Sequence, residues 1–353
     1  MQETPPESTL YPKITNHIRD VIKRLRYKLR DPSNPEAKVT LEDPIPIVGT
    51  IKLHGTHADI LVHSNNNIVL QSRNNPNLLP TSDNQGFAAS MGQKRASILS
   101  LRDQYLARWK DLNRGQQIDE TIPVTIAGEW IGEKIQKGVA ISRLSRRFVT
   151  ISVKINGSWV LDTLYSDIEA PHDDIYNIAR GGIYTATLHT SDPQRTTAEL
   201  EPLAEKIAAR CPFAESFHVL GEGEGLVWKL VPYADDADLW FKTKGGKFKP
   251  TFAPAPKTPA TDVAEKREAV ARLARAWVGE QRLEQGWDYL REMGVERSLK
   301  GIGEFLKWVQ NDVIVEERGY VQENEVDEGM LRMEIMKVAK PWFLERVERE
   351  EEE

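Results

Sequence analysis

A proline-rich segment divides this chain into two parts with different residue patterns. Residues 250–261 carry four prolines, which disfavour helix interiors and central strands, so an extended linker is predicted there. Short apolar runs predominate before it, and apolar residues recur at helical spacing after it. We therefore expect a first domain over residues 1–250, a linker over 251–261 and a helical C-terminal domain over 262–353.

The first part combines predicted strands with interspersed helices. Val149, Ile151, Val153 and Ile155 alternate with polar residues, as in a half-buried strand. Strands are predicted at 45–52, 59–62, 68–71, 123–129, 148–155 and 225–230, and helices at 13–30, 87–112 and 196–210. Because no βαβ rhythm is present, the pattern predicts an α+β fold with antiparallel sheets rather than a doubly wound one.

The second part has the apolar spacing of amphipathic helices. Asp262 is suited to cap the first helix, with Glu265 as its capping-box partner. The expected apolar faces comprise Val270, Leu273 and Trp277 in one helix, Ile302, Phe305, Leu306, Val309 and Val313 in another, and Leu331, Ile335 and Val338 in a third.

Composition excludes several classes of protein. The single cysteine, Cys211, excludes a disulfide framework and a cysteine-ligated zinc site. No stretch approaches the roughly 20 apolar residues of a membrane span, and residues 1–10 lack the shape of a signal peptide. We expect an intracellular monomer with no membrane partner.

The charge distribution bears on nucleic-acid binding. A formal charge of −6 disfavours a nucleic-acid partner, but residues 345–353 hold six acids and two arginines, so the rest of the chain is near −2. Basic clusters occur at residues 19–30, at Arg143, Arg146 and Arg147, and at residues 242–249. A solvated face is the alternative interpretation of each cluster.

One short motif points to nucleotide chemistry. Lys52-x-His54-Gly55 ends the apolar run at 45–52. A lysine at a strand exit, once deprotonated, can attack the α-phosphate of ATP and hold AMP through a nitrogen–phosphorus bond. Alone, the lysine is equally well read as a strand residue facing water. Three further elements follow it in order, namely Gly128-Glu129-Trp130, Glu224-Gly225-Leu226-Val227-Trp228-Lys229 and Lys242-Thr243-Lys244.

This ordered series resembles the covalent nucleotidyltransferases, and more narrowly the RNA ligase 2 family of ATP-dependent 5′–3′ RNA ligases, over roughly residues 10–250. His54 favours RNA ligases, because DNA ligases and capping guanylyltransferases usually carry Asp there. The resemblance implies an ATP-grasp-like adenylyltransferase domain that uses ATP and Mg²⁺ (or Mn²⁺). It implies joining of RNA 3′-hydroxyl and 5′-phosphate ends through AMP on Lys52 and then an adenylylated RNA.

The resemblance also implies roles for residues before position 130. Lys52 corresponds to the nucleophile, and His54 to the histidine close to the phosphate chemistry. Gly55 corresponds to a tight turn where a side chain would block the approach. Arg73 is expected to engage the 5′-phosphate end, and Glu129 to bind the ribose hydroxyls.

Further roles follow for the later residues. Phe148 is expected to stack on adenine, although a core position is its alternative reading. Glu224 is expected to orient hydrated Mg²⁺, which prefers oxygen ligands. Lys229 corresponds to the motif lysine five residues after Glu224. Lys242 and Lys244 correspond to the pair that contacts the AMP phosphate. These three lysines are also expected to favour a neutral Lys52.

The chain departs from the family pattern at two positions, and a zinc site is an alternative interpretation of its histidines. His57 stands where relatives often carry Asn, and Ile51 where they often have Glu. A zinc site built on His54, His57 and His63 is disfavoured, because positions 54 and 57 differ in strand parity.

Two other functions stay open. A DNA ligase is disfavoured by His54 and by the lack of a recognisable β-rich domain after Lys244. A non-catalytic RNA-end-binding protein is disfavoured by the retained nucleophile, Lys52. The sequence does not distinguish a nicked, hairpin or single-stranded substrate.

Overall fold

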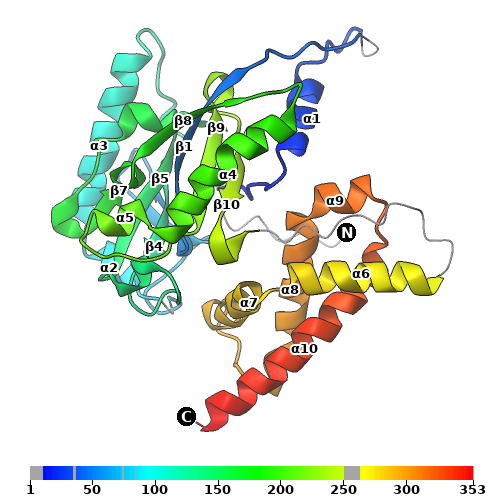
Figure 1. The fold of residues 1–353 in the computed structure, drawn as a ribbon. Coiled ribbons are helices and arrows are strands. Elements are labelled where there is room, and N and C mark those ends of the chain that lie inside the picture. The colour runs from blue at the N-terminus through cyan, green and yellow to red at the C-terminus, as the bar shows by residue number, and fades with distance from the viewer. Residues whose placement is uncertain (1–10, 35–36, 74, 84, 250–262, 353) are drawn as a thin grey trace. The chain divides into compact units, whose positions relative to one another are not determined.

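The computed structural model describes residues 11–34, 37–73, 75–83, 85–249 and 263–352 (Figure 1). The chain divides into two compact units, residues 1–248 and 249–353. The predicted linker at 251–261 and the predicted helix cap Asp262 lie outside the described residues. Each unit is described separately below.

One sheet of the first unit has four antiparallel strands in the order β10-β9-β1-β8. Its strands are β1 (Ile45–Lys52), β8 (Ile183–Leu188), β9 (Gly225–Leu230) and β10 (Phe241–Lys244). In its register, Gly225 lies opposite both Lys52 and Lys244. The ends of three strands therefore meet at one place.

The second sheet has the order β3-β2-β4-β5-β6, and β7 pairs with β5 in parallel. Its strands are β2 (Thr56–Val62), β3 (Ile68–Ser72), β4 (Val124–Ile131), β5 (Arg147–Ile155), β6 (Ser158–Trp159) and β7 (Ile175–Asn177). Glu129 pairs with Val149, and Trp130 with Phe148. Because side chains alternate along a strand, Glu129 and Val149 share one face, and Trp130 and Phe148 the other.

Helices cover both sheets. Helices α1 (Ile18–Lys28) and α4 (Pro193–Ala209) contribute Leu25 and Leu200 to a core that also holds Ile47 and Trp228 of the first sheet. Helix α4 lies across β9 and β10 (Figure 1). Helices α2 (Phe87–Gly92) and α3 (Arg95–Leu112) pack against the second sheet around the buried residues Phe87, Ile98, Ile60, Ile126 and Phe148.

Short helices fill the connections of the first unit. They are α5 (Pro212–Glu215) and the 3₁₀ turns η1 (Ala140–Arg143), η2 (Asp162–Tyr165), η3 (Pro171–Asp173), η4 (Ile178–Gly181), η5 (Val231–Tyr233), η6 (Ala237–Leu239) and η7 (Gly246–Phe248).

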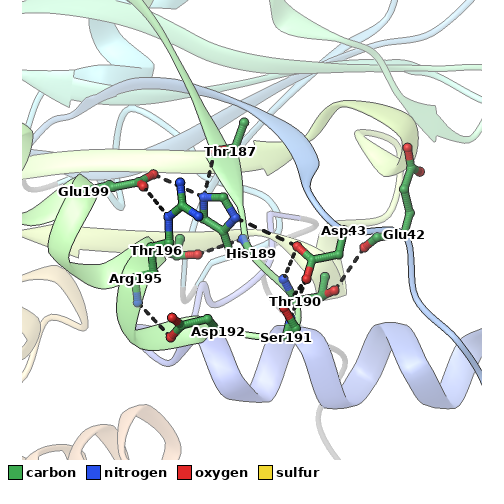
Figure 2. Close-up of polar contacts among 10 residues, drawn as sticks. All are labelled: Glu42, Asp43, Thr187, His189, Thr190, Ser191, Asp192, Arg195, Thr196 and Glu199. Atoms are coloured by element: carbon green, nitrogen blue, oxygen red, sulfur yellow. Dashed lines mark hydrogen bonds and ion pairs between the residues drawn. The ribbon is translucent and has the colours of Figure 1, made fainter.

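A polar cluster joins the start of β1 to the start of α4 (Figure 2). Asp43 accepts backbone N–H hydrogen bonds from Thr190 (3.2 Å) and Ser191 (3.0 Å). His189 Nε2 lies 3.4 Å from a carboxylate oxygen of Glu199, nearly two turns into the helix. These contacts fix the connection that follows β8 and precedes α4.

The second unit is helical. It contains α6 (Val263–Trp277), α7 (Glu280–Glu292), η8 (Leu299–Gly301), α8 (Ile302–Glu316), α9 (Arg318–Glu323) and α10 (Glu328–Glu352). Its core is centred on the fully buried rings of Trp287, Phe305 and Phe343. Among the described helices of both units, none has the length and apolar character that a membrane crossing requires.

The predicted α+β class, with antiparallel sheets and a helical C-terminal region, is confirmed. Two predicted helices are wrong in extent. The helix at 13–30 begins only at Ile18, because Thr15 instead forms a bridge with Phe241 beside β10. The helix at 87–112 is interrupted at Gln93 and Lys94, between α2 and α3. Strands β6, β7 and β8 were not predicted.

Candidate active site

Lys52 lies at the end of β1, on the face of the first sheet that contacts the second. Alternation places its side chain on the same face as Lys229, Lys242 and Lys244. Contact across this face is shown by Lys229, whose ammonium donates to Ser152 Oγ on β5 at 2.8 Å. The four lysines of the predicted site therefore share one face, between the two sheets.

Glu224 joins three of the predicted residues. Its Oε2 atom lies 2.7 Å from Lys52 Nζ and 3.5 Å from His54 Nδ1, and its Oε1 atom lies 3.3 Å from Lys244 Nζ. The carboxylate is 2% exposed. Burial alone would raise the pKa of Glu224, but the charges of Lys52 and Lys244 and a hydrogen bond from His54 hold this pKa well below its usual value. Glu224 is therefore an anion at neutral pH.

His54 is a buried support for this carboxylate. Its ring packs against Phe248, with centroids 4.9 Å apart, and the residue is 5% exposed. A ring held in this way restricts where Glu224 can turn. Phe248 was not predicted from the sequence, since it lies outside all four motif elements.

Two glycines allow the backbones around the lysines to approach closely. A Cβ on Gly55 would lie 2.6 Å from Ile131 Cγ2 and 2.9 Å from Glu129 Oε2. A Cβ on Gly225 would lie 2.0 Å from the Thr243 carbonyl oxygen, and its φ of +157° also disfavours a side chain. The requirement for glycine at position 55 comes from packing against β4, since this residue is not among those with positive φ.

Glu129 lies on β4 of the second sheet. Its Oε2 atom is buried and has no hydrogen-bond partner among the described residues. Burial raises the pKa of Glu129, and nearby Glu224 raises it further, while the positive charges of His57, Lys52 and Arg73 act in the opposite direction. An unpartnered buried acceptor is costly and is suited to an O–H donor supplied by a ligand.

Arg73 and Lys242 complete the cationic surroundings. Arg73 follows β3 and is close enough to Glu129 for its charge to lower the pKa of that carboxyl group. Lys242 lies on β10, where its backbone N–H donates to the Thr15 carbonyl at 2.8 Å. Its side chain shares the sheet face of Lys244, as alternation predicts.

Lys229 is not brought into the Glu224 cluster. Its ammonium lies 2.7 Å from Asp162 and 3.7 Å from the centroid of the Trp240 ring. Burial lowers the pKa of Lys229, while Asp162 acts to raise it. The charge of Lys229 is thus balanced by its own carboxylate. No sequence motif pointed to Asp162, which lies in the 3₁₀ turn η2.

Phe148 does not reach the Lys52 face. It is fully buried in the core under α2, with its ring 5.6 Å from that of Phe87. Its strand neighbour Val149, directly opposite Glu129, occupies the facing side instead. The sequence left a core position as the alternative for Phe148, and the structure places it there.

The donor set is compatible with one kind of metal site. Within the described residues, no group of three or more His, Cys, Asp or Glu side chains is arranged to hold a metal ion. Glu224 is the carboxylate that contacts Lys52 directly. Mg²⁺ usually keeps several waters and binds one or two carboxylates together with substrate phosphates, which suits a single protein carboxylate.

No protein-family model matches the chain, and no curated protein matches it. Solved structures of Naegleria gruberi RNA ligase are similar. The complex with pyrophosphate has a TM-score of 0.42 and 15% identity, over 68% of this chain and 57% of that chain. A lysine-to-alanine variant with ATP and Mn has a TM-score of 0.42 and 14% identity, over 69% and 57%.

The chain thus spans little more than half of the RNA ligase structures that it resembles. With TM-scores below 0.5, these likenesses decide neither fold nor activity. The case for function rests on the geometry of this chain.

Proposed function

We propose that this protein is an ATP-dependent RNA ligase that joins RNA 3′-hydroxyl and 5′-phosphate ends. The observation that carries the proposal is the shared contact of Lys52 and Lys244 with the buried Glu224 carboxylate. This contact unites three of the four ordered motif elements, and Glu129 of the remaining element faces them. A nucleophile, a second cation and a buried anion at one strand junction suit phosphoryl transfer better than simple binding.

The first step is attack of Lys52 Nζ on the α-phosphorus of ATP. A nitrogen–phosphorus bond forms, the bond from the α-phosphorus to the bridging oxygen breaks, and pyrophosphate leaves with the electron pair. Lys52 must first release a proton to solvent, because only the neutral amine is nucleophilic.

Glu224 would hold a divalent metal, since Mg²⁺ prefers oxygen ligands. When bound, Mg²⁺ or Mn²⁺ supplies charge that neutralises the transferring phosphate. Lys244 and Lys242 hold the AMP phosphate from the β10 side. Glu129 accepts hydrogen bonds from the ribose hydroxyls through its unpartnered Oε2.

The two later steps move AMP to RNA and then release it. The 5′-phosphate of RNA attacks the AMP phosphorus and displaces Lys52, and the RNA 3′-hydroxyl then displaces AMP from the new 5′–5′ linkage. Arg73, near Glu129, is suited to hold the 5′-phosphate. Phe148 is left out of this proposal because it lies in the core.

A sealing assay tests the proposal against its alternatives. Matched nicks ending in a 3′-ribose or a 3′-deoxyribose are incubated with the protein, ATP and Mg²⁺, since a protein distinguishes them through the 2′-hydroxyl. We expect sealing of the ribose ends and accumulation of adenylylated RNA when the 3′-hydroxyl is blocked. Equal sealing of both sugars on RNA and DNA templates would favour a DNA ligase. Binding without any sealing would favour a non-catalytic end-binding protein.

A further inference from the structure

Helix α1 carries a line of exposed cations. Arg19, Lys23 and Arg26 recur at spacings of four and three residues, and Arg30 follows four residues later, just past the helix end. Residues at these spacings lie on one side of a helix, about 5–6 Å apart. All four side chains are exposed. We call these four residues the basic stripe.

The basic stripe is not neutralised by the fold. Its neighbour Lys28 pairs with Asp236 at 2.6 Å and with Asp238 at 3.1 Å. In contrast, none of the four stripe side chains has a carboxylate within ion-pair distance among the residues that the structure describes. Like charges on one helix side repel each other, which lowers helix stability. In a chain of net charge −6, such a line of cations indicates a binding surface for an external anion.

An aromatic ring adjoins the basic stripe. Tyr27 is 71% exposed, and the guanidinium carbon of Arg30 lies 5.7 Å from the centroid of its ring. Exposed aromatic rings beside cations are typical of surfaces that bind single-stranded nucleic acid, where bases stack on the ring and cations hold the phosphates. Tyr27 contributes little to the core from this position.

The buried face of α1 argues against a membrane surface. Ile18, Val21, Ile22 and Leu25 pack into the core of the first unit, so the helix has no apolar face left to insert between lipids. The remaining polyanion of suitable chemistry is a nucleic-acid strand, whose regularly repeated phosphates match a line of cations.

The basic stripe begins near the candidate active site. Thr15 forms a bridge with Phe241, and its carbonyl accepts the N–H of Lys242 at 2.8 Å. Helix α1 starts only three residues later, a span of at most about 10 Å. The same strand carries Lys244, which contacts Glu224. An RNA strand bound along α1 therefore passes close to β10, the edge strand that carries Lys242 and Lys244, although α1 itself packs on the face of the sheet opposite Lys52.

We infer that the basic stripe binds the phosphodiester backbone of the RNA substrate, with Tyr27 stacking on a base. This inference rests on the proposed function. For single strands, the slope of log K against log salt is about −0.7 per neutralised phosphate. Four contacts therefore contribute about 3 to the slope.

The test is the salt dependence of binding to a short fluorescein-labelled single-stranded RNA, followed by fluorescence anisotropy. The test variant replaces all four stripe cations by Gln, which keeps good helix propensity. A control variant of the same net charge replaces four other exposed cations of the first unit by Gln. These are Lys110, Arg195, Lys206 and Arg210. Circular dichroism establishes that both variants are folded.

We expect the slope of the stripe variant to fall by about 3, and that of the control variant by less than 1. Replacing Arg19, Arg26 and Arg30 by Lys is expected to keep the slope, because charge is conserved. Tyr27→Ala is expected to weaken binding at least about five-fold without changing the slope.

Equal slopes for the stripe and control variants would overturn the inference. The inference would also be overturned if the stripe variant lost binding to anionic phosphatidylserine vesicles while its RNA binding was unchanged. That result would make the basic stripe a membrane surface. Labelling of the wild-type protein from ATP is measured separately. If the wild type is labelled but its RNA binding does not depend on the basic stripe, this inference alone is contradicted. If the wild type is not labelled but its RNA binding does depend on the basic stripe, the ligase proposal alone is contradicted.

Discussion

The ammonium of Lys52 lies 2.7 Å from the carboxylate of Glu224, although 172 residues separate them in the chain. The antiparallel pairing of β1 with β9 brings them together, because Lys52 lies opposite Gly225. Glu224 is buried, so this contact is little screened by water. The chemistry proposed for this protein depends on this one contact more than on any other.

Glu224→Gln is expected to slow labelling from ATP by about 10²–10³-fold, because it removes a preorganised charge from the site. The matched control is Glu222→Gln, two residues away, whose side chain is exposed and pairs with Lys247. Single-turnover labelling with saturating ATP and Mg²⁺ measures both rates. Equal rates for the two variants would remove Glu224 from the mechanism.

Glu129→Gln is expected to stabilise the protein while weakening its use of ATP. Since burial raises the folded-state pKa of Glu129, its contribution to stability is present below the unfolded pKa and is lost as pH rises through the folded value. The burial that raises the pKa of Glu129 therefore lowers the stability of the folded state at neutral pH, and Gln is expected to relieve this cost.

The expected change for Glu129→Gln is a rise in Tm of a few degrees, at about 2–4 °C per kcal/mol. The exposed Glu133→Gln serves as the control. Thermal melts at pH 7 and at pH 4 measure the effect, which is expected to shrink at the lower pH. A variant that melts below wild type at pH 7 would show that this carboxylate is well accommodated.

Lys229 and Asp162 are expected to act as a structural pair. Removing one partner of a buried ion pair costs about 3–5 kcal/mol, because the other charge is left buried. Lys229→Met and Asp162→Asn are each expected to lower stability by this amount, and the double variant by much less than their sum. Urea unfolding of the four proteins gives the coupling energy. Additive losses would mean that the two charges act independently.

The polar cluster of Figure 2 is expected to make stability depend on pH. The Ser191 hydroxyl lowers the pKa of Asp43, burial acts against it, and the Ser191 and Thr190 backbone N–H groups lower it further. A depressed pKa gives stability that is present above the unfolded value and is lost as pH falls through the folded value.

Asp43→Asn is therefore expected to lower Tm at pH 7, and the difference from wild type is expected to shrink as pH falls below the unfolded Asp value of about 3.9. The exposed Asp235→Asn is the control and is expected to melt like wild type. Thermal melts across this pH range measure both variants. A difference that is constant with pH would show that the charge of Asp43 is not involved.

Much of the first unit could be predicted from local pattern. Strands β1 and β9 have the predicted bounds, because each is an apolar run closed by a polar motif. The grouping of Lys52, Glu224 and Lys244 agrees with the order of motifs. Strand β8 was missed because Thr185 and Thr187 interrupt its apolar character at the edge of the sheet.

Other features depend on tertiary pairing that a single sequence does not reveal. The register between β4 and β5 decides that Val149, rather than Phe148, lies opposite Glu129. The predicted helix at 13–30 was too long for a similar reason. Thr15 pairs with Phe241 of β10, and this pairing replaces helix before Ile18. Asp162 lies outside the sequence motifs, so its pairing with Lys229 is seen only in the structure.

The most direct test of the account is covalent labelling of Lys52. The protein is incubated with ATP labelled on the α-phosphate and Mg²⁺, and acid-labile label on the protein is measured. We expect label on the wild type and on Lys110→Ala, an exposed lysine of α3, and none on Lys52→Ala or on Lys52→Arg, whose guanidinium never becomes neutral. Label retained by Lys52→Ala would contradict the central claim.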